Sequence, residues 1–236
     1  MSVNYFTFAG KDSKDFKCYI SGRGTFSAPA RNYEMISIPG RDGDIVGFEK
    51  RLENSSASYP AFIYEDFRTN LRDLRSFLLS KRGYYRLTDT YHPDEFRKAV
   101  YRGGLEPEVM TNNKAGSFEI VFECQPQRYL TSGETKTTFT ADGSINNPTY
   151  FPAAPLLRVY GAGTLGIGSE SVIISAVDEY VDIDCEIMEA YKGTVSCNAN
   201  VTVSGSDFPK LQPGNNGIDL SGSITKVEIY PRWFML

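Results

Sequence analysis

The chain has 236 residues, of which 41% are hydrophobic and 23% charged, with 25 Lys and Arg against 29 Asp and Glu. This composition excludes disordered, low-complexity and collagen-like classes, and a chain of this length can bury roughly 70% of its extended surface without disulfides or metals. No stretch approaches ~18 consecutive apolar residues, and the N-terminus lacks the basic and apolar regions of a secretion signal. We therefore expect a protein that is made in a cytoplasm and contacts no membrane.

The first 130 residues contain many short runs that are typical of strands. Aromatic and β-branched residues favour strands, and the chain holds 15 Tyr and 15 Phe, with 21 Gly and 12 Pro to make turns. The pattern is clearest in residues 117–124, which predict a strand with one buried face. There Phe118, Ile120, Phe122 and Cys124 alternate with Glu119, Val121 and Glu123. The strands predicted in this half are Tyr5–Phe8, Tyr19–Ile20, Tyr33–Ile38, Ala61–Tyr64, Tyr84–Leu87, Arg97–Tyr101 and Ser117–Cys124.

One helix is predicted within residues 66–81. Phe67, Leu71, Leu74 and Leu78 recur at helical spacing and form a single apolar stripe. Asp66 is expected to cap the start of the helix, and a glycine at position 83 to end it. The opposite face carries Arg68, Arg72, Asp73 and Arg75, which we interpret as a solvated face, with a subunit or nucleic-acid contact as the alternative. The region is therefore expected to be a sheet or sandwich covered by one helix.

The composition changes near residue 130. Residues 1–130 carry 19 basic and 17 acidic side chains, whereas residues 131–236 carry 6 and 12. A segment rich in Ser, Thr, Gly, Asn and Pro follows, so we place a domain boundary here and predict domains at 1–130 and 131–236. Only strands are predicted in the second domain, with the spacing of a β-sandwich. They are Lys136–Ala141, Leu156–Tyr160, Val172–Ser175, Val181–Ile187, Gly193–Asn198, Ile218–Leu220 and Ile224–Tyr230.

Few residues could carry catalytic or metal chemistry. His92 is the only histidine, and Cys18, Cys124, Cys185 and Cys197 form no CxxC pair. The sequence therefore predicts a turn histidine and four reduced, buried thiols rather than a metal cage or a nucleophile with its base. No catalytic, cofactor-binding or metal site is predicted, and the acidic balance argues against specific nucleic-acid binding.

Two other patterns have alternative interpretations. The segment with Gly161, Gly163 and Gly166 matches G-x-G-x-x-G, but β-branched alternation follows it instead of a helix, so we predict a glycine-rich hairpin and no nucleotide site. Asp182, Asp184 and Glu186 alternate with apolar residues, which predicts a solvated acidic face. A cation or partner contact, or a pair of glycosidase carboxylates, are the alternatives.

Several motifs resemble those of one known family. In the first half these are SIPGRDGDI (37–45), YYRLTDTYHPDEFRKAVYRG (84–103) and FEIVFECQPQRYL (118–130). In the second half they are NPTYFPAAPLLRVYGAGT (147–164), DFPKLQPGNN (207–216) and KVEIYPRWFML (226–236). In wording, order and spacing they are similar to the distal tail protein family of long-tailed bacteriophages and prophages. The resemblance covers essentially the whole chain.

The resemblance implies a fold and a role. The expected fold is mainly β: an N-terminal β-sandwich or split-barrel-like ring domain with one α-helix and a projecting hairpin, plus a C-terminal galectin-like β-sandwich. The expected role is a non-enzymatic hub at the virion tail tip, formed as a hexameric ring or a dodecamer. The implied partners are the major tail tube protein, the tape measure protein, and the tail-associated lysin, fibre or receptor-binding protein.

The family's hairpin extension corresponds to residues 33–52 and reaches a neighbouring subunit. Gly43 tolerates a left-handed backbone, which fits a tight turn between two strands. A ring of identical chains needs two different complementary surfaces, so we assign part of one to charged hairpin residues. These are Arg41, Asp42, Asp44, Glu49, Lys50 and Arg51. An ordinary surface hairpin within one protomer is the alternative. For the whole protein, the alternative function is a carbohydrate-binding adsorption module that recognises the host cell surface.

Overall fold

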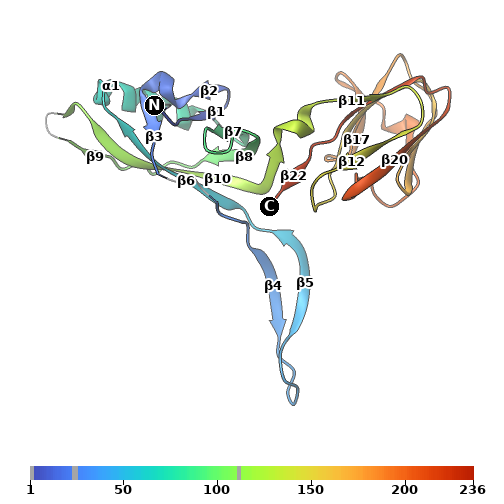
Figure 1. The fold of residues 1–236 in the computed structure, drawn as a ribbon, viewed down its shortest axis with the longest axis horizontal. Helices are drawn as coiled ribbons and strands as arrows, with labels where there is room; N and C mark the ends of the chain where they lie inside the picture. The colour runs from blue at the N-terminus through green and yellow to red at the C-terminus, as the bar shows by residue number, and fades with distance from the viewer. Residues whose placement is uncertain (1–2, 23–25, 111–112) are drawn as a thin grey trace. The chain divides into compact units, whose positions relative to one another are not determined.

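The computed structural model describes residues 3–22, 26–110 and 113–236, without the side chains of residues 48–50. The chain divides into two compact units, Met1–Arg128 with Leu236, and Tyr129–Met235. Figure 1 shows that both are built mainly from strands. The described part of the chain contains one α-helix, as the sequence predicted.

A curled, half-barrel sheet forms the first unit. Its strands follow the order β2-β1-β7-β8-β10-β6-β3, and β9 pairs with β10. The longest strand, β10, runs antiparallel to β6, with Phe122 opposite Ala57 and Ile120 opposite Tyr59. The strands are β1 (Phe6–Phe8), β2 (Lys11–Asp12), β3 (Cys18–Ile20), β6 (Ser55–Ile63), β7 (Tyr85–Asp89), β8 (Glu95–Tyr101), β9 (Glu108–Val109) and β10 (Gly116–Leu130), with a 3-10 helix at Ser13–Phe16.

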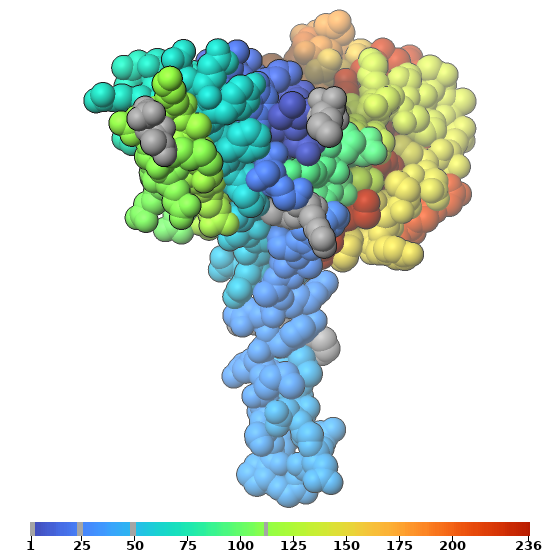
Figure 2. All heavy atoms as spheres, turned by 60° about the vertical axis from the view of Figure 1, so that its left-hand side comes forward, coloured from blue at the N-terminus to red at the C-terminus, as the bar shows by residue number. Residues whose placement is uncertain are grey.

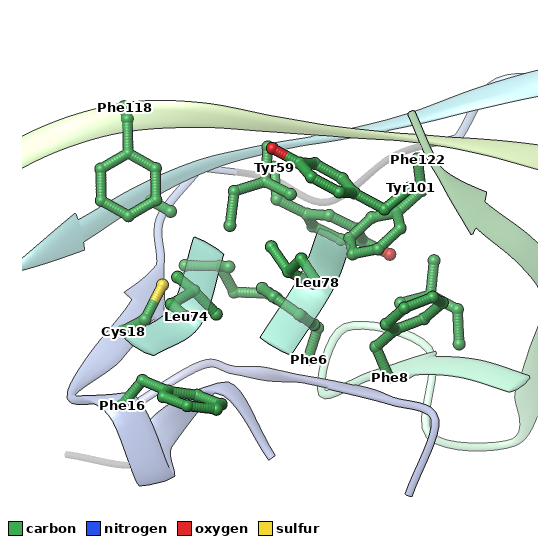
Figure 3. Packing of buried hydrophobic residues seen from close by; sticks show 14 of the residues in the cluster. Phe6, Phe8, Phe16, Cys18, Tyr59, Leu74, Leu78, Tyr101, Phe118 and Phe122 are labelled. Atoms are coloured by element: carbon green, nitrogen blue, oxygen red, sulfur yellow. The ribbon is translucent and has the colours of Figure 1, made fainter. Parts of the chain in front are cut away.

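The helix α1 (Phe67–Ser80) packs its apolar stripe onto this sheet. Phe67, Leu71, Leu74 and Leu78 are buried, as their spacing predicted. Figure 3 shows Leu74 and Leu78 pointing into a cluster of aromatic rings that lies between the helix and the sheet. The ring of Phe122 is fully buried at the centre of this cluster, 4.9 Å from the Phe8 ring and 5.4 Å from the Phe6 ring between centroids. Alternation along β10 and helical spacing along α1 therefore produce one shared core.

The start of α1 differs from the sequence-based prediction. Asp66 occupies the N-cap position, but its φ of 43° places it in the left-handed region and its side chain makes no capping hydrogen bond. The first turn is held by the backbone, because the Asp66 carbonyl accepts hydrogen bonds from the N–H groups of Thr69 and Asn70. The Asn70 side chain also donates to the Glu65 carbonyl at 2.8 Å. A cap that depends on a β-region backbone cannot form where the residue is left-handed.

The second unit consists of two antiparallel sheets. One has six strands in the order β11-β21-β13-β16-β17-β18, and the other has five in the order β12-β20-β14-β15-β19. Strands of the six-stranded sheet are β11 (Thr137–Phe139), β13 (Leu156–Tyr160), β16 (Val181–Asp184), β17 (Glu189–Lys192), β18 (Val195–Ser196) and β21 (Lys226–Tyr230). Strands of the five-stranded sheet are β12 (Gly143–Asn147), β14 (Gly163–Ile167), β15 (Glu170–Ile174), β19 (Val201–Val203) and β20 (Gly214–Gly222). The short elements outside the two sheets are β22 (Phe234–Met235) and 3-10 helices at Thr131–Glu134 and Asn198–Asn200.

The core of the second unit is mainly aliphatic. Leu157, Val159, Ile183, Leu165 and Ile229 are buried in it, together with Trp233. The two sheets therefore form a β-sandwich whose inner faces carry alternate residues of each strand. Among the described residues, no helix is both long enough and apolar enough to cross a membrane.

Candidate functional site: an uncovered hairpin

The strands β4 (Arg31–Ile36) and β5 (Ile45–Leu52) form a two-stranded sheet of their own. Their antiparallel register pairs Tyr33 with Phe48, Met35 with Val46 and Ile36 with Ile45. Figures 1 and 2 show this ribbon extending out of the first unit as a narrow projection. The turn passes through Gly40 and Gly43, whose φ angles of 82° and 79° lie in the left-handed region that a side chain disfavours.

Every described side chain from residue 31 to residue 46 is exposed. Directly paired residues point to the same side of a ribbon, so Tyr33, Met35 and Val46 share one face, and Ile36 and Ile45 share the other. These are large apolar side chains, and Met35 is 59% exposed. Both faces of the hairpin therefore present apolar surface that the chain itself leaves open.

An isolated two-stranded ribbon has little stability of its own in water. Full burial of one large apolar side chain is worth about 1.5–3 kcal/mol, so a partner that covers several of them would stabilise the ribbon. A contiguous exposed apolar patch usually marks an interaction site. These properties make the hairpin the strongest candidate functional site on the described surface.

The charged residues assigned from the sequence lie on this hairpin. Arg41, Asp42 and Asp44 are exposed in the turn, and Arg51 is exposed on β5. The backbone of Glu49 and Lys50 lies on β5, but their side chains are outside the described residues. Exposed ion pairs contribute about 0–1 kcal/mol each, so these charges set specificity and register more than affinity.

The predicted solvated acidic face is not formed: Asp182 and Asp184 are buried, and of the three carboxylates only Glu186 is exposed. Asp182 and Asp184 are each only 6% exposed. The guanidinium of Arg158 binds both oxygens of Asp182 at 2.7 and 2.8 Å, and that of Arg232 binds both oxygens of Asp184 at 2.7 and 2.8 Å. The prediction was wrong because the covering arginines come from strands and turns far along the chain.

Glu186 completes this arrangement. It accepts hydrogen bonds from the Tyr129 hydroxyl at 3.1 Å and from Arg232 at 3.3 Å. Burial alone raises the pKa of Asp184, but the hydrogen bonds and charge of Arg232 outweigh it, so the pKa lies below its ordinary value. Burial likewise acts to lower the pKa of Arg232, and Asp184 raises it above the ordinary value. Because Asp182 and Asp184 each bind an arginine through both oxygens, neither of these two carboxylates is free to act as an acid or a nucleophile.

The glycine segment does not form the predicted hairpin: it links β13 in one sheet to β14 in the other, and Gly163 and Gly166 lie on β14, which is a strand and not a helix. Gly161 and Gly163 have φ angles of 99° and 151°, and a side chain at either position would collide with the backbone carbonyls of Ser223 and Ser221. The glycines are thus explained by close approach to β20 and the turn after it. A phosphate-binding turn needs a helix immediately after it, which is absent from this segment.

His92 and the cysteines have structural surroundings. The imidazole Nδ1 lies 3.2 Å from an Asp89 oxygen, and the other Asp89 oxygen accepts a hydrogen bond from the buried Tyr59 hydroxyl at 2.7 Å. All four cysteines are free, and burial raises the pKa of Cys18 and Cys185 to about 12. Such thiols are poor nucleophiles at neutral pH.

Sequence reasoning identified the hairpin but assigned it by charge and missed its apolar residues. The usable signal was the consecutive apolar pair Met35 and Ile36, and the similar pair Ile45 and Val46 after the turn. Apolar residues on both faces are typical of a strand that is covered on both sides. Here nothing within the described chain covers either face.

The first half of the chain matches a known family. Residues 11–124 match the family model of the phage tail protein RIFT-related domain. The resemblance to siphophage distal tail proteins is thus confirmed. No curated protein matches the sequence.

Solved structures share the fold of the whole chain. The crystal structure of phage SPP1 Dit (gp 19.1), described as a paradigm of hub adsorption apparatus in phages that infect Gram-positive bacteria, matches with a TM-score of 0.74 at 18% identity, over 100% of both chains. A chain of the phage P2 baseplate in its activated conformation with Ca matches with a TM-score of 0.54 at 11% identity, over 97% of this chain and 98% of that one. The Sr form of the same baseplate gives 0.55 at 10% identity, with the same coverage. The fold is thus that of phage tail hub and baseplate proteins.

Proposed function

We propose that this protein is a structural distal tail protein whose copies close into a hexameric ring at the phage tail tip. The ring joins the tail tube to the tail-associated lysin and the receptor-binding apparatus. The observation that carries the proposal is the hairpin of residues 31–52, apolar on both faces and uncovered, in a chain with the fold of tail hub proteins. A ring supplies the cover that the single chain lacks, because each copy can place its hairpin on the next.

The proposed role is geometric rather than catalytic. The carboxylates that most resembled a catalytic pair are held by Arg158 and Arg232, and the fold neighbours are tail and baseplate proteins. The major tail tube protein, the tape measure protein and a lysin, fibre or receptor-binding protein are the proposed partners. The lumen would pass DNA without reading its sequence, as the acidic balance of the chain favours.

The test is the solution mass of the purified full chain, by size-exclusion chromatography with light scattering, followed by negative-stain microscopy of the same peak. A mass of six or twelve times 26.3 kDa with a central hole supports the ring. Reversal of both hairpin arginines, Arg41→Glu with Arg51→Glu, should then give monomers. Reversal of an exposed arginine outside the hairpin, Arg82→Glu, should leave the ring intact.

Other results of these experiments would contradict the proposal. A wild-type chain that stays monomeric at every accessible concentration would overturn the ring. Monomers that bind glycans on an array would support the alternative function, a carbohydrate-binding adsorption module. An unchanged oligomer in the Arg41→Glu/Arg51→Glu variant would show that these hairpin charges do not belong to the interface.

A further inference from the structure

A groove lies between α1 and the segment that contains β9. Its volume is about 530 Å³. Arg68, Arg72 and Arg75 line it along α1, and Pro107 and Val109 line it along the other segment. Figure 1 shows α1 and β9 at the same end of the first unit. The groove therefore has one basic wall and one apolar wall.

The positive charge of this groove is largely unneutralised within the chain. Arg72 lies 3.0 Å from the Asp73 carboxylate in an exposed pair. Among the described residues, no carboxylate lies within ion-pair distance of Arg68 or Arg75, and none lines the groove. A ligand that completes this site therefore needs carboxylates or other anionic groups on the side that faces α1.

Two other hollows of the described surface are balanced in charge. The hollow of about 360 Å³ next to the groove contains Lys114, but also Glu65 and Asp66. The hollow of about 520 Å³ near β10 contains Arg102 and Glu123, which bind each other at 2.8 Å. Of these three hollows, only the groove on α1 has cations without matching carboxylates.

The three arginines are placed where they destabilise their own helix. They follow one another at spacings of four and three residues, so their like charges lie on one face and repel each other. Arg68 also lies in the first turn, where the helix dipole disfavours positive charge, and that turn holds no acidic residue. Local choices that oppose the fold are expected where the side chains serve binding.

We propose that this groove binds an extended segment of another protein that is both acidic and apolar. Alternate side chains of an extended segment point to opposite sides, so its carboxylates would meet the arginines while its apolar side chains cover Val109, which is 48% exposed. Carboxylates two residues apart are separated by about 7 Å, close to the rise of about 6 Å along α1 between Arg68 and Arg72. The inference goes beyond the ring, because the groove is complete within one chain.

Two other occupants match the groove less well. The hairpin of a second copy has four acidic and four basic residues between positions 31 and 52, so it has no net charge to offer the arginines. A single-stranded nucleic acid needs exposed aromatic rings on which its bases stack. Among the described residues that line the groove, Phe67 is the one aromatic residue, and it is only 4% exposed.

The test is fluorescence anisotropy with the full-length chain and a short labelled peptide in which Glu and Leu alternate. The wild-type chain should bind this peptide, and added salt should weaken the binding. Arg68→Glu and Arg75→Glu should each weaken it about tenfold, because repulsion replaces attraction. The matched control is Arg82→Glu, which changes an exposed arginine outside the groove by the same charge and should bind like the wild type.

Peptide variants separate the two walls of the groove. Gln in place of Glu should abolish binding, and Ser in place of Leu should weaken it. A wild-type chain that binds no peptide overturns the inference, as does an equal loss in Arg75→Glu and Arg82→Glu. An oligothymidylate that binds more tightly than the peptide, and is lost in Arg68→Glu, overturns it in favour of nucleic acid.

Further controls separate this inference from folding and from the ring. Circular dichroism should show wild-type melting for each variant; if Arg68→Glu is unfolded, Arg68→Gln replaces it and should also weaken peptide binding. Peptide binding by a chain that stays monomeric would support the groove although the ring had failed. A ring whose α1 groove binds no peptide would overturn the groove and leave the ring standing.

Discussion

The hairpin of the first unit and the six-stranded sheet of the second both place charged and bulky side chains on strand surfaces, but they treat them differently. On the sheet, Asp182 and Asp184 each hold a bidentate arginine, and the Arg158 guanidinium lies 4.3 Å from the centre of the Tyr180 ring. On the hairpin, Met35, Ile45 and the turn carboxylates touch solvent. The charged groups on the sheet find their partners within one chain, whereas the hairpin side chains are left without cover by their own chain. Substitutions on the sheet surface therefore test folding, whereas substitutions on the hairpin surface test assembly.

The largest effect on folding is expected in the aromatic core of the first unit. Phe122→Ala removes a fully buried ring that contacts Phe6 and Phe8, and should lower the free energy of unfolding of this unit by about 3–5 kcal/mol. The matched control is Val121→Ala, because Val121 directly precedes Phe122 on β10 and faces outward. Urea unfolding followed by aromatic circular dichroism measures both. Similar losses for the two variants would contradict the packing described here.

An intermediate effect is expected on the self-contained sheet. Arg232→Met leaves the buried Asp184 carboxylate without its cation and should cost about 2–4 kcal/mol at neutral pH. The control Lys210→Met breaks an exposed pair with Asp207 and should cost less than about 1 kcal/mol. Equal costs would mean that burial of the Asp184 pair has no energetic consequence.

The Arg232 effect should also depend on pH. The folded-state pKa of Asp184 is lowered, so the pair stabilises the fold above the ordinary carboxyl value of 3.8 and loses this contribution as the pH falls through the folded-state pKa. The difference between wild type and Arg232→Met should therefore shrink in acid. Urea unfolding midpoints of both proteins, measured from neutral to strongly acidic pH, would show this decrease. A difference between the two proteins that stays constant with pH would assign the effect to packing.

The smallest effect on folding, with the largest effect on assembly, is expected for the hairpin. Met35→Ser with Val46→Ser changes two exposed side chains, so the free energy of unfolding of a dissociated chain should change by less than about 0.5 kcal/mol. The same variant should lower the mass of the assembled protein in light scattering, because it removes apolar cover from the proposed interface. A stable ring with this variant would place the hairpin outside the contact.

Local periodicity predicted the elements of the first unit well. The stripe on α1 and the alternation on β10 depend only on residues a few positions apart, so each could be recognised without knowing its neighbours. Short strands such as β12, β14, β17 and β19 were missed. They have three to five residues, several with glycines, and are defined mainly by pairing across the sheet.

The candidate site was predictable only in part. The turn around Gly43 indicated a hairpin, but that its apolar residues would remain exposed could not be known, because exposure depends on what the rest of the chain covers. The error at Asp182 and Asp184 has the same origin: Arg158 is 24 positions from Asp182, and Arg232 is 48 positions from Asp184. Long-range pairs leave no local pattern.

The second unit begins and finishes at one place. Near its start, Leu130 donates a backbone hydrogen bond to Trp233 at 2.8 Å, and the Gly133 carbonyl accepts one from Arg232 at 2.9 Å. The first and last residues of the unit are thus held next to each other by backbone hydrogen bonds. The loops of such a unit can therefore be lengthened or replaced without separating its two ends.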